Sequence, residues 1–155
     1  MGYTKLTAIQ QKSLPLSLDN KDLIAQAKTG SGKTVAFCIP IINKLNIKNF
    51  RIQSLILAPT RELANQIALE IRKLSRHIHN LKVLTLCGGT PFKPQVLSLS
   101  HGAHIIVATP GRVLKHIEQN NIDLENINTL VLDEADKMLD MGFYDDIMEI
   151  IDTLP

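Results

Sequence analysis

The sequence predicts an α/β domain in which helices cover both faces of a parallel β-sheet. Short apolar runs typical of buried strands alternate along the chain with segments whose apolar residues recur at helical spacing. This alternation favours parallel strands joined by right-handed helical crossovers. A length of 155 residues with 45% hydrophobic content suits one compact domain, so we expect residues 1–155 to form a single domain.

Five short apolar segments are predicted to be the strands of this sheet. Each is apolar enough for a buried parallel strand, and most run directly into glycines or into the start of a helix. Within the last of them, residues 129–132 are expected to be buried on both faces. The five segments are residues 23–25, 53–58, 83–87, 104–108 and 127–132.

Helices are predicted between and around these strands. The first spans residues 7–14, is capped by Thr7 and ends near Pro15. A second begins near Lys33 and is apolar almost all round, so it should be buried against the sheet, and Pro40 predicts a kink or an early break. Further helices are predicted after Thr60, after Thr109 and over residues 143–154.

The stretch AKTGSGKT is predicted to bind a nucleotide triphosphate. Gly30 and Gly32 can adopt backbone angles that a Cβ forbids, so the loop can turn its N–H groups inward as a nest for phosphates. Lys33 adds a positive charge near the β- and γ-phosphates, and the Thr34 hydroxyl is placed to ligate Mg²⁺. The alternative is a glycine-rich turn in which Gly-Lys-Thr occurs by chance. The predicted nucleotide-binding residues are Ala27, which replaces the first glycine of the motif, Lys28, Thr29, Gly30, Ser31, Gly32, Lys33 and Thr34.

Two adjacent carboxylates follow the last predicted strand. Ligands of open α/β sheets bind at the carboxyl ends of the strands, and Asp133 lies at such an end. We therefore expect Asp133 to hold Mg²⁺, directly or through water, and Glu134 to orient or deprotonate the attacking water. This hypothesis requires Lys33 and Asp133 to lie at neighbouring edges of one sheet. An acidic helix N-terminus favoured by the helix dipole is the alternative.

Composition limits the remaining possibilities. No apolar run approaches the length of a membrane span and no signal-peptide core is present, so we expect a soluble, intracellular protein. Cys38 and Cys87 lie in apolar runs without metal-ligand spacing and are predicted to be buried free thiols. A net charge of +2 does not argue for a polyanionic partner, and 4% aromatic residues without Trp make base stacking an improbable main mode of binding.

Five blocks in order resemble the first RecA-like domain of the DEAD-box RNA helicases. They are AKTGSGKT, PTRELA, the pair Gly88-Gly89, TPGR and DEAD, together with an opening GYTKLTAIQ, and they cover essentially the whole chain. The resemblance implies a RecA-like P-loop fold that couples ATP binding and hydrolysis to RNA duplex unwinding. The segments CGGTPF and HIIVATPGR are most similar to the bacterial branch that acts on ribosomal RNA during large-subunit assembly.

The resemblance also implies roles that the residues alone do not establish. Gln10, with Tyr3 and Lys5 nearby, is implied to contact adenine, which makes ATP the nucleotide; on its own, Gln10 would be interpreted as a surface residue. Leu6 stands where the family usually has Pro. Taken singly, the remaining blocks are more often ordinary helix caps. The residues implied to lie along the RNA sugar-phosphate backbone are Thr60, Arg61, Gly88, Gly89, Thr109 and Arg112.

A second RecA-like domain completes the family pattern and carries arginines needed for hydrolysis. The present sequence stops before it, so residues 1–155 alone are expected to be essentially inactive as an ATPase. We expect a cytoplasmic protein. Two rival hypotheses are a non-enzymatic nucleotide-binding module and a DNA translocase with the same core.

Overall fold

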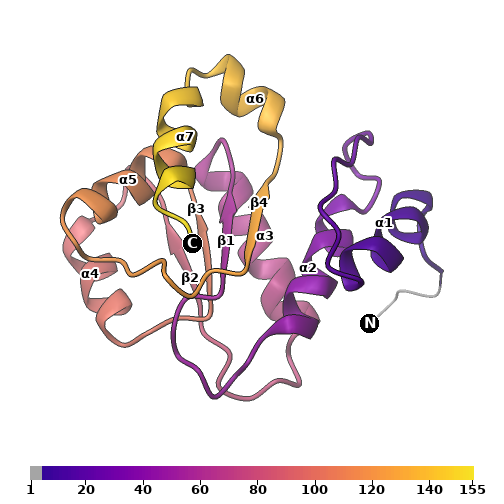
Figure 1. Cartoon of the computed structure of the whole chain (residues 1–155), viewed down its shortest axis with the longest axis horizontal. Coiled ribbons are helices and arrows are strands. Elements are labelled where there is room, and N and C mark those ends of the chain that lie inside the picture. Colours follow the sequence, from indigo (N-terminus) through magenta and orange to yellow (C-terminus); the bar gives the residue numbers. More distant parts are fainter. Residues whose placement is uncertain (1–4) are drawn as a thin grey trace. The chain divides into compact units, whose positions relative to one another are not determined.

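A computed structural model describes residues 5–155 of the chain (Figure 1). The chain divides into two compact units, Met1–Leu45 and Asn46–Pro155. The first unit contains the glycine-rich loop, and the second contains the sheet and the acidic pair. Tyr3 lies outside the described residues.

The first unit contains two helices, α1 (Ala8–Leu18) and α2 (Lys33–Lys44). The predicted end of α1 near Pro15 is wrong, because the Pro15 carbonyl accepts a hydrogen bond from the Asp19 N–H at 3.2 Å and the helix runs on to Leu18. A proline removes one donor and crowds the preceding turn, but it leaves its own carbonyl available to the next turn. α2 begins at Lys33 as predicted and continues through Pro40 without an early break.

The predicted strand over residues 23–25 is wrong. Residues 21–28 have no regular secondary structure, and the side chain of Ile24 is fully exposed. A strand is stabilised by hydrogen bonds to a neighbouring strand, and the described part of the first unit contains no strand that offers them. Three apolar residues are also too few to require burial.

The second unit is built on a four-stranded parallel sheet with the order β2-β3-β1-β4. Leu55 of β1 pairs with Ile106 of β3 on one side and with Leu130 of β4 on the other. The predicted parallel sheet is therefore confirmed for four of the five expected strands. The elements are β1 (Ser54–Leu57), α3 (Arg61–Leu74), β2 (Val83–Leu86), α4 (Phe92–Ser100), β3 (Ile105–Ala108), α5 (Pro110–Glu118), β4 (Thr129–Leu132), α6 (Ala135–Asp140) and α7 (Tyr144–Asp152).

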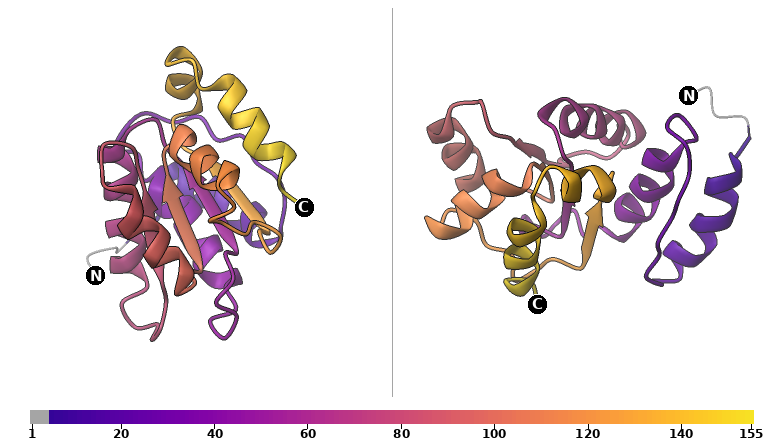
Figure 2. Two further views of the ribbon diagram at one scale, coloured as in Figure 1. Left: turned by 90° about the vertical axis from the view of Figure 1, so that its left-hand side faces the viewer. Right: turned by 90° about the horizontal axis from the view of Figure 1, so that it is seen from above.

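Helices cover both faces of this sheet, as predicted. α3 lies on one face, and α5 and α7 lie on the other (Figure 2). Successive strand residues point to opposite faces, so Leu55 and Leu57 join the core cluster that includes Val113 of α5 and Ile150 of α7. The predicted apolar positions of α3 are largely buried: Ala64, Ile67, Ala68 and Ile71 are each inaccessible to solvent.

Two features of the second unit differ from expectation. All four residues of β4 are half-buried rather than buried, because β4 is the edge strand of this sheet and pairs only with β1. Helices α4 and α6 were not predicted. The α4 segment FKPQVLSLS shows little apolar periodicity, and α6 has only six residues, so neither gives a helical signal.

Both cysteines are buried free thiols, as predicted. Burial raises the pKa of the Cys87 thiol, which keeps it protonated at neutral pH. Within residues 5–155, no helix combines the length and the apolar character that crossing a membrane requires.

Candidate functional site

The glycine-rich loop of the first unit depends on glycine at its end. Gly30 has φ +78° and Gly32 has φ +91°, which are left-handed conformations that residues with a Cβ rarely adopt. Gly32 is also the N-cap of α2, and its carbonyl accepts a hydrogen bond from Gln10 Nε2 at 3.2 Å. A Cβ at Gly32 would lie 2.6 Å from that nitrogen, so the loop and the side chain of Gln10 fit together only without one.

The loop makes hydrogen bonds to its own carbonyl groups through one side chain and one backbone N–H. The Lys33 ammonium donates to the Ala27 carbonyl at 2.5 Å, and the Ser31 N–H donates to the Lys28 carbonyl at 3.2 Å. The Ser31 hydroxyl is buried and has no hydrogen-bond partner among the described residues. Thr34 is half-buried in the first turn of α2, where backbone N–H groups lack helical partners. An ammonium, an orphan hydroxyl and free N–H groups together suit a chain of phosphates.

Gln10 is buried, with 3% of its surface exposed, so its interpretation as a surface glutamine is wrong. Its side-chain oxygen accepts from the Thr7 N–H at 3.0 Å, while its nitrogen donates to Gly32. These two bonds join the start of α1 to the loop. The adenine contact of Gln10 stays a prediction, and Lys5 is exposed.

The predicted RNA-binding residues gather at one edge of the sheet of the second unit. The carboxyl ends of parallel strands share an edge, and each predicted block follows directly on a strand. The Gly88 N–H donates to the Thr109 hydroxyl at 3.4 Å, and Arg61 Nη1 would lie 3.4 Å from a Cβ on Gly89. Residues separated by 21 positions in the sequence (Gly88 and Thr109) and by 28 positions (Arg61 and Gly89) are thereby neighbours.

The two threonines at this edge behave differently. The Thr60 hydroxyl accepts from the Leu63 N–H at 3.2 Å and caps α3 as predicted. Thr109 is the N-cap residue of α5, but its hydroxyl makes no cap hydrogen bond and instead accepts from Gly88. Pro110 occupies the first turn of α5 as predicted. The Thr109 hydroxyl therefore ties the end of β3 to the loop after β2.

Arg112 is held by groups that the sequence analysis missed. Its Nη1 donates to the Thr90 carbonyl and to Gln95 Oε1, both at 3.1 Å. Gln95 also accepts from the buried His116, at 2.9 Å. The signal for His116 is present in the sequence, since it lies three residues after Val113 on the apolar face of α5, but nothing in the sequence indicates Gln95.

His116 makes the stability of the protein sensitive to acid. Burial, with smaller contributions from the positive charges of Arg112 and Lys115, lowers the pKa of His116 from 6.5 to about 4. The unfolded chain therefore binds more protons than the folded chain between these pH values, so the free energy of unfolding falls as pH drops through this window. The contribution of His116 to that fall is about 3 kcal/mol by pH 4.

The prediction is tested with His116→Gln, which keeps an N–H donor and removes the titration. We expect the difference in stability between wild type and this variant to narrow as pH falls from 7 to 4, as measured by urea unfolding. For His79→Gln, at an exposed site, the free energy of unfolding should change with pH in the same way as for wild type. The same pH dependence of unfolding free energy for His116→Gln and wild type would contradict the prediction.

The acidic pair lies at the same edge, directly after β4. The Asp133 N–H donates to the Leu57 carbonyl at 3.0 Å, which continues the pairing of β4 with β1 by one residue. Glu134 has φ +52° and ψ +48°, a left-handed conformation that costs a residue other than glycine about 1–3 kcal/mol. Its Oε2 pairs with Lys137 Nζ at 2.8 Å, and this hydrogen bond raises the pKa of Lys137. Strain of this kind is common at functional sites.

The structure places Lys33 in the first unit and Asp133 in the second, so their approach around one metal-bound triphosphate stays a prediction. In the described part of the chain, no three or more His, Cys, Asp or Glu side chains form a group able to hold a metal ion.

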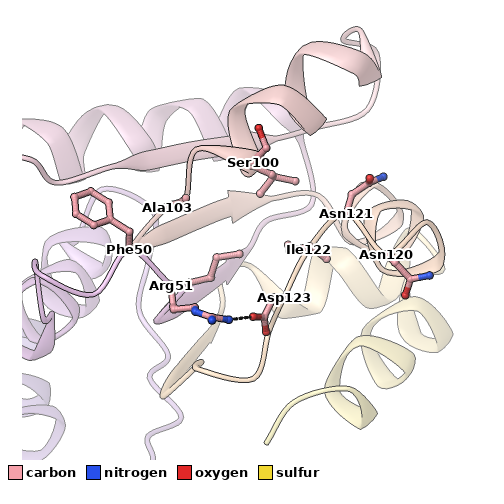
Figure 3. Close-up of a pocket in the computed structure, with 11 residues that line it drawn as sticks. Phe50, Arg51, Ser100, Ala103, Asn120, Asn121, Ile122 and Asp123 are labelled. Atoms are coloured by element: carbon pink, nitrogen blue, oxygen red, sulfur yellow. Dashed lines mark hydrogen bonds and ion pairs between the residues drawn. The ribbon is translucent and has the colours of Figure 1, made fainter.

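A cavity of about 300 Å³ lies at the opposite edge of the sheet (Figure 3). It is lined by residues that precede β1, β3 and β4, among them Phe50, Ala103 and Asn120. Its charged groups pair with each other, since Arg51 binds Asp123. None of the predicted site residues lines this cavity, which lies near the amino ends of the strands.

Comparisons with known proteins all lead to the same group. Residues 7–155 match the DEAD/DEAH box helicase family. The chain is 52% identical over its whole length to the ATP-dependent RNA helicase DbpA of Escherichia coli and 48% identical to the DEAD-box ATP-dependent RNA helicase CshA of Geobacillus kaustophilus. It covers 34% and 33% of these proteins, so it spans about a third of the length of the curated relatives that it matches. A crystal structure of a DEAD box protein from Methanococcus jannaschii matches 99% of this chain, with 42% of that chain covered, a TM-score of 0.94 and 45% identity.

Proposed function

This chain belongs to the DEAD/DEAH box helicase family, and we propose that it is the ATP-binding RecA-like domain of a DEAD-box RNA helicase. In the complete protein, this domain couples ATP binding and hydrolysis to the unwinding of RNA duplexes. The observation that carries the proposal is the gathering of Arg61, Gly89, Thr109 and Asp133 at one edge of one parallel sheet.

The loop of the first unit supplies the nucleotide-binding part of the proposal. Its N–H groups and the Lys33 ammonium bind the phosphates, and Gln10 contacts adenine while its Nε2 supports Gly32. In this proposal, Thr34 and Asp133 would hold Mg²⁺. When bound, the ion neutralises charge on the phosphates and on the leaving group. The Glu134 carboxylate takes the proton of the attacking water.

The edge of the second unit supplies the RNA-binding part. Thr60 and Thr109 lie at the N-termini of α3 and α5, where unpaired N–H groups and the helix dipole favour phosphate. Arg61 and Arg112 add charge and paired donors. Contacts of these kinds bind the sugar-phosphate backbone and do not distinguish bases, so we propose binding that depends little on RNA sequence.

The nucleotide site is tested by Lys33→Ala in the full-length protein. We expect ATP to bind about 10- to 100-fold more weakly, because the variant loses one charge-assisted contact to the phosphates worth about 1.5–3 kcal/mol. Titration with a fluorescent ATP analogue measures this change. Lys12→Ala removes the same charge from an exposed position of α1 and should bind ATP like wild type. Equal ATP affinity of Lys33→Ala and wild type would overturn the loop assignment.

The rival hypotheses are separated by activity assays on the full-length protein. ATP turnover stimulated by RNA, with separation of a short RNA duplex, supports the helicase. Turnover stimulated only by DNA would indicate a DNA translocase, and ATP binding without turnover would indicate a non-enzymatic nucleotide-binding module.

We further propose that the complete protein carries a second RecA-like domain, since the curated relatives are about three times longer than this chain. A role on ribosomal RNA during large-subunit assembly is supported by the similarity of the segments CGGTPF and HIIVATPGR to the bacterial branch with that role. A cytoplasmic location is supported by the two buried free thiols, which are typical of a reducing compartment.

A further inference from the structure

Gln95 is the centre of a buried hydrogen-bond network beneath the proposed RNA-binding edge. Its side chain is 8% exposed and uses every donor and acceptor site of its amide. Nε2 donates to the Cys87 carbonyl at 3.1 Å and to the Thr90 hydroxyl at 2.7 Å. Oε1 accepts from Arg112 and from His116. The amide therefore connects the loop after β2 with helix α5.

The partners of Gln95 determine its orientation and the tautomer of His116. The Cys87 carbonyl only accepts and the Arg112 guanidinium only donates, so the nitrogen must face Cys87 and the oxygen must face Arg112. Because Gln95 Oε1 accepts from His116, the proton of the neutral imidazole is on Nε2. The imidazole stacks on Phe92 with ring centroids 4.3 Å apart and an interplanar angle of 15°. Both rings are thereby held in place under the amide.

This network leaves one side of Arg112 available. Both hydrogens of Nη1 are used, one by Thr90 and one by Gln95. Within residues 5–155, Nε and Nη2 have no hydrogen-bond partner, and together they form the edge of a guanidinium that can bind a phosphate with two parallel bonds. The guanidinium also lies 5.5 Å from the centroid of the Phe92 ring, which further restricts it.

We propose that Gln95 and His116 are positioning residues for RNA binding: Gln95 orients Arg112, and His116 orients Gln95. A free arginine side chain must lose much of its rotamer freedom when it binds phosphate, and an arginine that is already held loses less. The inference rests on the proposed function, because it assumes that Arg112 contacts the RNA backbone.

The test uses the full-length protein and a fluorescent single-stranded RNA. Gln95→Met keeps the length of the side chain and removes all four hydrogen bonds. We expect RNA affinity to fall about tenfold, because Arg112 is then no longer held and must lose its rotamer freedom when it binds phosphate. We also expect the dependence of log affinity on log salt concentration to become shallower by about 0.7, as for one lost phosphate contact. The RNA concentration for half-maximal ATPase activity should rise while turnover at saturating RNA stays close to wild type.

Three controls distinguish positioning from loss of structure. Gln119→Met, at an exposed site in the same unit, should match wild type. Adding Gln95→Met to Arg112→Ala should weaken binding no further than Arg112→Ala does alone, because Gln95 acts through Arg112. If Gln95→Met does not fold, His116→Leu and His116→Gln replace it: the leucine variant should bind RNA weakly, and the glutamine variant, which keeps a donor, should recover affinity.

Two results would overturn the inference, and they differ in what they mean for the proposed function. If Gln95→Met has wild-type RNA affinity and salt dependence while Arg112→Ala binds RNA weakly, Gln95 is excluded as a positioning residue. The proposed RNA contact of Arg112 is then still supported. Wild-type affinity in Arg112→Ala would remove both the RNA contact of Arg112 and the inference built on it.

Discussion

A protein consisting of residues 1–155 alone is expected to hydrolyse ATP about 10³ to 10⁵ times more slowly than the full-length protein with RNA. The reason is that residues 1–155 lack the arginines of a second RecA-like domain, which would stabilise the charge on the phosphates of ATP during hydrolysis. Each of the five arginines of this chain already has a protein partner. Two of them, Arg61 and Arg112, are assigned in the proposed function to RNA and not to the phosphates of ATP.

The measurement compares ATP turnover of the two proteins at saturating ATP, with and without RNA. Binding of a fluorescent ATP analogue by the short protein is the control that its nucleotide site is folded. RNA-stimulated turnover by residues 1–155 at a rate near that of the full-length protein would contradict the prediction. It would also show that the chemistry needs no second domain.

Replacing Glu134 by Gln in the full-length protein is expected to lower ATP turnover about 10²- to 10⁴-fold, the usual effect of losing a general base. ATP affinity should stay unchanged, because the amide keeps the size of the carboxylate and an oxygen that can accept from Lys137. The Glu134 carboxylate is suited to the role: Oε2 pairs with Lys137, and Oε1 has no partner among residues 5–155.

The rate of a single turnover and the affinity for ATP are measured separately for Glu134→Gln. Asp140→Asn is the matched control, since it removes one negative charge from an exposed position of α6, the helix that begins directly after Glu134. Its turnover should equal that of wild type. Wild-type turnover in Glu134→Gln would exclude Glu134 as the general base.

Most strands were predictable because buried parallel strands are continuous apolar runs, as in the segment that forms β3. The run at residues 23–25 is also apolar, yet it is exposed and forms no strand. Local composition does not specify hydrogen-bond partners, which lie elsewhere in the chain. Pro15 was misjudged for a related reason: its effect on α1 depends on the packing that holds the helix together, with Leu14 buried.

Gln10 and Gln95 show the limit of sequence reasoning for the site. Both are polar residues that average statistics place at the surface. Both are buried because their amides satisfy backbone groups, at Gly32 for one and at Cys87 for the other. No periodic pattern reports such bonds, since each depends on two segments that fold against each other.

The sequence by itself determined the family and the parallel α/β architecture, and it indicated the proposed phosphate loop and acidic pair, because all of these follow from short motifs and from runs of apolar residues. The family is confirmed by the match of residues 7–155 to the DEAD/DEAH box helicase family. Only the tertiary structure decided that Gly88 meets Thr109, that Glu134 adopts a left-handed conformation and that Gln95 holds Arg112. These features arise where distant segments come together, and a linear pattern does not encode which donors and acceptors then meet.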